Sequence, residues 1–199
     1  DKDALTKKIV PDPYFSVDPN KTIPFPPELD DLCRLHYLAR KRKVTTVLEF
    51  GIGKSTYIFN DALEKNEKEY GAYVKDNLRR TNPFELHSID NSKDWINSVK
   101  SNAKNSLSKN TTLHCCELIV STFNDRLCTY YENLPNISPD LIYLDGPDQF
   151  SPKGSVRGLS TNHPDRMPMV ADILTLEHFL IPGTLIIVDG RIEPHPFIN

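Results

Sequence analysis

The chain has 199 residues, of which 38% are hydrophobic and 26% charged, a balance typical of one soluble globular domain. Its formal net charge of −3 argues against a general binder of nucleic-acid backbones, because such proteins carry a strongly basic face. No apolar run approaches the ~20 residues that span a bilayer. We therefore expect a small-molecule partner, and neither a nucleic acid nor a membrane.

The cysteine content points to a reducing compartment. The four cysteines, Cys33, Cys115, Cys116 and Cys128, are irregularly spaced and match neither a disulfide framework nor a paired zinc site. We expect reduced, mostly buried thiols and a cytoplasmic location.

Residues 1–27 are rich in proline and indicate an N-terminal arm in front of a single domain over residues 28–199. Short apolar and β-branched runs within that domain predict five strands: Val44–Glu49, Leu86–Asp90, a segment within Thr112–Val120, Asp140–Asp145 and Thr184–Asp189. The last run is nearly all apolar, as expected of a strand that is covered on both faces.

Helical spacing of apolar residues appears between most of these strands. It predicts helices over Glu28–Lys43, from Lys54 to about Glu69, after Asn91-Ser92 with Trp95, Val99 and Ala103 on the buried side, and over Met167–Ile181. A polar insert ends near Pro83, and a polar loop over residues 148–166 has the length of a lid or binding segment. Strands that alternate with helices predict a three-layer α/β fold with a doubly wound, mainly parallel sheet.

Acidic residues stand at the carboxyl ends of four predicted strands: Glu49, Asp90, Asp145 and Asp189. Ligands of open parallel sheets bind at that edge, because the strand ends and the loops after them form a crevice there. Gly51 and Gly53 follow the first strand, and glycines at such a turn let the backbone bend sharply and approach a ligand. The first amides of the next helix would then be available to an anionic group.

Two phosphate-binding motifs fit this turn poorly. A dinucleotide fingerprint requires a third glycine where this chain has Thr56. A P-loop ends in Gly-Lys-Ser, as does Gly53-Lys54-Ser55, but its first glycine would fall on Leu48.

A third motif matches better. The segment Val47–Thr56 resembles the first motif of the class I S-adenosylmethionine-dependent methyltransferases, an acidic residue followed by a spaced glycine pair. Later motifs of the family also have similar segments in this chain, in the same order: Leu86–Asp90, Asp140–Pro147 and Leu180–Asp189. The resemblance covers about residues 44–191 and implies a Rossmann-like methyltransferase fold.

The resemblance also implies roles for residues around the glycine turn. Glu49 would lie near the ammonium group of S-adenosylmethionine, and Gly51 and Gly53 would border its methionine part. Ser55, together with the helix N-terminus, would contact its carboxylate. Asp90 would accept hydrogen bonds from the ribose hydroxyls, with Asn91 beside it in the cofactor site.

The implied reaction is methyl transfer to a small-molecule acceptor, expected at oxygen. Asp145 is the first choice for the general base that a hydroxyl acceptor requires. A second use of Asp145 is to hold Mg²⁺ together with Asp189, but Pro147 departs from that branch of the family and no third ligand is evident.

Two other functions stay open on the sequence alone. One is a P-loop-like nucleotide hydrolase that uses Lys54, and the other is a non-catalytic binding module on the same fold. Only ten residues follow Asp189, so we expect the last two strands of the methyltransferase fold to be missing.

Overall fold

The computed structural model describes residues 28–81, 83–103, 106–147, 149–163 and 170–189. The expected N-terminal arm, residues 1–27, lies outside this part of the chain. None of the helices in the described residues is long and apolar enough to cross a membrane.

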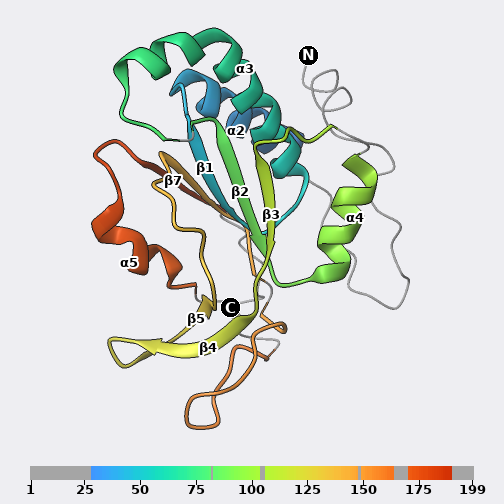
Figure 1. Ribbon diagram of the computed structural model, residues 1–199. Helices are drawn as coiled ribbons and strands as arrows, with labels where there is room; N and C mark the ends of the chain where they lie inside the picture. Colours follow the sequence, from blue (N-terminus) through green and yellow to red (C-terminus); the bar gives the residue numbers. More distant parts are fainter. Residues whose placement is uncertain (1–27, 82, 104–105, 148, 164–169, 190–199) are drawn as a thin grey trace, which may run out of the picture.

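Five strands form one parallel sheet in the order β3-β2-β1-β6-β7 (Figure 1). Their bounds are Thr46–Phe50 for β1, Glu85–Asp90 for β2, Thr111–Cys115 for β3, Leu141–Leu144 for β6 and Leu185–Val188 for β7. The chain builds outward from β1 through β2 to β3, and then returns to the other side of β1 for β6 and β7. The predicted α/β fold with a mainly parallel sheet is confirmed.

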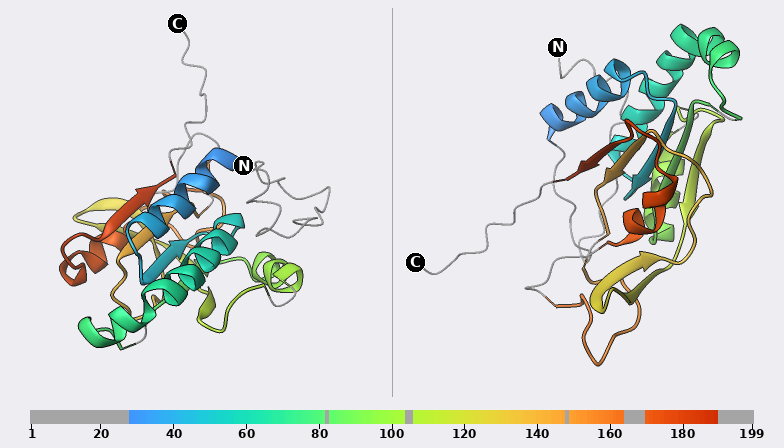
Figure 2. Two further views of the ribbon diagram at one scale, coloured as in Figure 1. Left: turned by 90° about the horizontal axis from the view of Figure 1, so that it is seen from above. Right: turned by 90° about the vertical axis from the view of Figure 1, so that its left-hand side faces the viewer.

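Helices cover the two faces of the sheet unequally (Figure 2). Three helices pack on one face: α2 (Leu29–Lys41), α3 (Lys54–Asn77) and α4 (Lys93–Ala103). The other face carries α5 (Asp172–Leu176), which continues into a 3-10 turn over Glu177–Phe179. Side chains of β1 alternate between the two layers, so Val47 faces the three helices, whereas Leu48 and Phe50 face the side of α5.

An antiparallel hairpin, which the sequence did not predict, lies where β3 ends. The single strand expected within Thr112–Val120 is in fact β3 followed by β4 (Leu118–Phe123), and β4 pairs with β5 (Arg126–Tyr131). Asn124 and Asp125 form the turn with φ of 48° and 62°, a conformation that these two residue types tolerate. Tyr131 packs on Phe50, with 5.8 Å between ring centroids, and so attaches the hairpin to the sheet.

Two helices differ from their predicted bounds. Helix α3 continues to Asn77 instead of ending near Glu69, because Val74 is buried and Glu69 is bound by Arg40 of α2 at 2.6 Å. The helix expected over Met167–Ile181 is shorter, and residues 164–169 lie outside the described residues.

Two predictions about burial were wrong, and a third was correct only in part. Strand β7 is an edge strand, so Ile186 and Val188 are 41% and 63% exposed and the strand is not covered on both faces. Trp95 packs against the core as predicted but is only partly buried, and Ile96 joins Val99 and Ala103 on the buried side of α4. Of the four free cysteines only Cys128 is buried.

Candidate functional site at the carboxyl edge of the sheet

The turn after β1 is fixed to both neighbouring strands. Gly51 donates its amide to the carbonyl of Ile89 in β2 at 2.8 Å, and Asp145 donates its amide to the carbonyl of Phe50 at 2.8 Å. Gly51 has a φ of +93°, and a Cβ at this position would lie 2.5 Å from the Asp145 carbonyl oxygen. Glycine is therefore required here by the close approach of the end of β6. Because β2 and β6 lie on opposite sides of β1, this turn occupies the point where the strand order reverses.

Asp90, at the end of β2, holds the same turn from the other side. One carboxylate oxygen accepts the amide of Ile52 at 3.1 Å, and the other accepts the amide of Ser92 at 2.8 Å. The Trp95 indole in α4 donates to the carbonyl of Ile52. Asp90 and the adjacent Asn91 are both partly exposed. The turn after β1 is thus bracketed by residues from the end of β2 and the start of α4.

Glu49 lies beneath this turn and is fully buried. Its carboxylate accepts hydrogen bonds from the hydroxyls of Ser55 at 2.5 Å, Thr56 at 2.7 Å and Ser88 at 2.5 Å. Burial raises the pKa of Glu49 to about 7, although the three hydroxyl donors lower it and the charge of Asp90 adds to the rise. Both oxygens face protein hydroxyls in this conformation, so the predicted contact of Glu49 with an ammonium group stays a prediction.

Helix α3 begins at the glycine turn without a side-chain cap. Gly53 is the N-cap residue, and its amide donates to the Thr56 hydroxyl at 3.0 Å. The first amides of an α-helix have no acceptor within the helix, which leaves a partial positive charge at its start. Ser55 is buried with its hydroxyl turned to Glu49, so a ligand at this point would meet the backbone of the first turn rather than that side chain.

The predicted general base lies beside the glycine turn. Asp145 follows β6 and is partly exposed, and Asp189 follows β7, where its amide donates to the carbonyl of Leu144 at 2.8 Å. The two acidic residues therefore follow the ends of two different strands, as predicted, and the structure shows that these strands are adjacent. Within the part of the chain that is described, no three His, Cys, Asp or Glu side chains gather as a metal site, so a magnesium site finds no support.

Sequence reasoning missed Ser88, Thr56 and Trp95. A signal for Ser88 exists, because parallel pairing of β1 with β2 places it beside Glu49 on the same face. Of the polar loop residues, Lys153 pairs with Glu117 at 2.5 Å, away from the glycine turn, along the outer edge of β4.

No protein-family model and no curated protein sequence matches this chain. Among solved structures, one match is the O-methyltransferase TomG from Streptomyces achromogenes, which is involved in tomaymycin synthesis and was crystallised in complex with SAM. The two chains are 15% identical and superpose with a TM-score of 0.37 over 63% of this chain and 47% of TomG. This chain thus spans less than half of TomG, and a likeness of this size assigns neither a family nor an activity.

Proposed function

We propose that this protein binds S-adenosylmethionine and transfers its methyl group to a small-molecule acceptor, at oxygen. One observation carries the proposal. A glycine turn at the point of strand reversal is held by Asp90, a partly exposed acid at the end of the neighbouring strand. In open parallel sheets this is the position of the nucleoside-binding crevice, where an acid receives the ribose.

The chain offers groups that suit each part of the nucleoside. The Asp90 carboxylate, which accepts the amides of Ile52 and Ser92, is partly exposed at the end of β2 and is the proposed acceptor for the ribose hydroxyls, with Asn91 alongside. The uncapped start of α3 suits the carboxylate of the methionine part. Glu49 acts as a positioning residue, because its bonds to Ser55 and Ser88 tie the first turn of α3 to β2.

When bound, S-adenosylmethionine supplies an electrophilic methyl group on a sulfonium. The remaining requirement is an acceptor atom held in line with that bond and relieved of its proton. Asp145 is the proposed base, because it follows β6 and flanks the glycine turn, and a carboxylate there can receive the proton of an acceptor hydroxyl.

Calorimetric titration of the full chain with S-adenosylmethionine, S-adenosylhomocysteine, ATP with Mg²⁺, and NAD tests the proposal against its rivals. We expect the two sulfur nucleosides to bind and the other two to fail. Tight binding of ATP that is lost in Lys54→Ala would support a nucleotide hydrolase instead. Binding of the sulfur nucleosides with no turnover of any hydroxyl acceptor would support a binding module.

A further inference from the structure

A cavity lies away from the glycine turn, lined by residues of the β4–β5 hairpin and of the start of α5. Its volume is about 450 Å³, within the range of pockets that hold small molecules, roughly 300–1,000 Å³. Phe123, Cys128, Val170 and Leu174 give it a mainly apolar lining. Cys128 belongs to this lining as a neutral group, because burial raises the pKa of its thiol.

The two walls of this pocket are fixed to each other. Ala171 donates its amide to the carbonyl of Thr129 at 3.0 Å, and the Asp172 carboxylate accepts the amide of Tyr131 at 3.1 Å. These bonds join the start of α5 to β5 across about 40 residues of sequence. The pocket therefore exists before any ligand arrives, which lowers the cost of binding.

Arg126 is the charged residue of the lining, with Asn124 as its polar neighbour. Its side chain is exposed, and no acid among the described residues forms an ion pair with it. The nearby Asp172 is buried and turned to the amide of Tyr131 instead. A guanidinium that is not neutralised, next to an apolar cavity, is complementary to an anion that carries an apolar body.

We propose that this pocket binds a small carboxylic acid with an apolar body, whose carboxylate pairs with Arg126 while the body lies against Phe123 and Leu174. A planar guanidinium with its fork of N–H donors matches a carboxylate in two parallel hydrogen bonds. Part of the binding energy comes from the apolar lining, because an exposed ion pair alone contributes little. The proposal does not depend on methyl transfer, since the lining shares no residue with the glycine turn.

The test uses 4-phenylbutyrate as the probe and 4-phenylbutanol as its uncharged counterpart. Both are titrated into the isotope-labelled full chain while backbone amide NMR signals are followed. We expect the acid to shift the signals of Phe123, Cys128 and Ala171 and to bind roughly two to five times more tightly than the alcohol. Equal binding of the two probes, or shifts confined to other residues, would overturn the proposal.

Single substitutions test whether Arg126 is the residue that binds the carboxylate of the probe. Arg126→Gln should weaken the binding of 4-phenylbutyrate roughly two- to fivefold. Arg79→Gln, which removes another exposed arginine that forms no ion pair within the described part of the chain, should leave the affinity unchanged. Leu174→Glu tests the same site from the other wall. A carboxylate placed there competes with the probe for Arg126 and should also weaken the binding of 4-phenylbutyrate. An unchanged affinity in both Arg126→Gln and Leu174→Glu would contradict the proposal. Addition of S-adenosylhomocysteine should not displace the probe, and displacement would mean that the two sites are one.

Discussion

The amide of Ile52 donates a hydrogen bond to the carboxylate of Asp90 across 3.1 Å, and this contact joins the glycine turn after β1 to the end of β2. The other oxygen of the same carboxylate accepts the amide of Ser92, just before α4. Asp90 therefore holds the glycine turn in place, in addition to its proposed role as acceptor for the ribose hydroxyls. Its removal should affect both folding and binding, and the two effects can be measured separately.

Asp90→Ala should weaken the binding of S-adenosylmethionine by ~1–3 kcal/mol, because the hydrogen bonds to the ribose and the support of the glycine turn are lost together. Calorimetric titration measures the affinity, and thermal unfolding measures the structural part. Ser92→Ala is the matched control, since it keeps the amide that Asp90 accepts and removes only the hydroxyl bound by the Trp95 amide. An Asp90→Ala variant with unaltered affinity would remove this residue from the binding site.

Gly51→Ala should destabilise the fold by about 2–5 kcal/mol. Alanine would have to adopt the positive φ of Gly51, which is unfavourable for a residue with a side chain. Its Cβ would also lie 2.5 Å from the Asp145 carbonyl oxygen. Gly154→Ala is the control, because Gly154 also has a positive φ of +88° but nothing lies within 4 Å of its added Cβ. Chemical denaturation should give a much smaller loss for Gly154→Ala. Equal losses would show that the contact with β6 does not matter.

Glu49→Gln should change how stability depends on pH. The pKa of Glu49 is raised to about 7 in the folded protein from an ordinary value of 4.5, so the folded state holds a proton that the unfolded state releases. The contribution of Glu49 to the free energy of unfolding is greatest below pH 4.5. It falls by on the order of 3 kcal/mol as the pH rises to about 7.

The variant cannot ionise, so its stability relative to the wild type should rise across this window. Asp172, whose pKa is also raised to about 7 by burial, titrates in both proteins and cancels in the comparison. Denaturation at pH 5, 6, 7 and 8 provides the measurement. Parallel curves for the two proteins would contradict the burial of a titrating Glu49.

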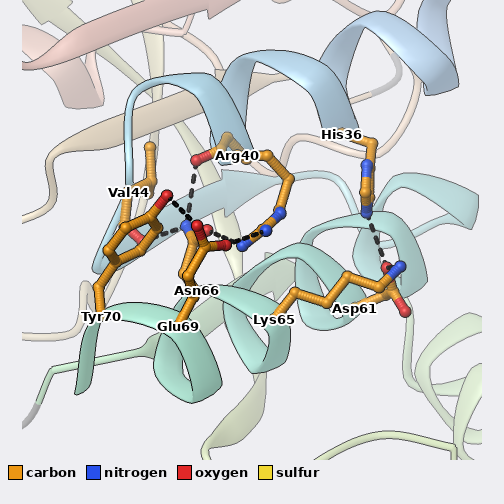
Figure 3. A network of polar contacts seen from close by, with 9 residues as sticks. His36, Arg40, Val44, Asp61, Lys65, Asn66, Glu69 and Tyr70 are labelled. Carbon is orange, nitrogen blue, oxygen red and sulfur yellow. Dashed lines mark hydrogen bonds and ion pairs between the residues drawn. The ribbon is translucent and has the colours of Figure 1, made fainter. Parts of the chain in front are cut away.

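Asn66→Ala should destabilise the α2–α3 pair by about 2–3 kcal/mol. The fully buried Asn66 amide donates to the carbonyls of Ala39 and Val44, and its oxygen accepts from Arg40 at 2.5 Å (Figure 3). Alanine leaves the Val44 carbonyl without this donor. Asn77→Ala removes an exposed side chain that bonds only within α3, and should change the free energy of unfolding by less than about 0.5 kcal/mol.

Local patterns in the sequence determined the parallel sheet, the glycine turn and the acids at the strand ends. Such patterns suffice to predict these features because an apolar strand, or a turn that needs glycine, depends on a few neighbouring residues. The same locality explains two errors. The first error was to predict a single strand within Thr112–Val120, where the structure has β3 and the first strand of a hairpin. The second was to end helix α3 near Glu69, because the residues beyond it are mostly polar although Val74 is buried.

Tertiary structure alone decided the contacts of Glu49 and Asp90. Glu49 could be predicted as a strand-end acid, but its hydrogen bond from Ser88, which is 39 residues away in the sequence, forms only through the pairing of β1 with β2. Asp90 reaches Ile52 across 38 residues in the same way. Contacts of this kind follow from strand register and helix packing, which short-range residue preferences do not encode.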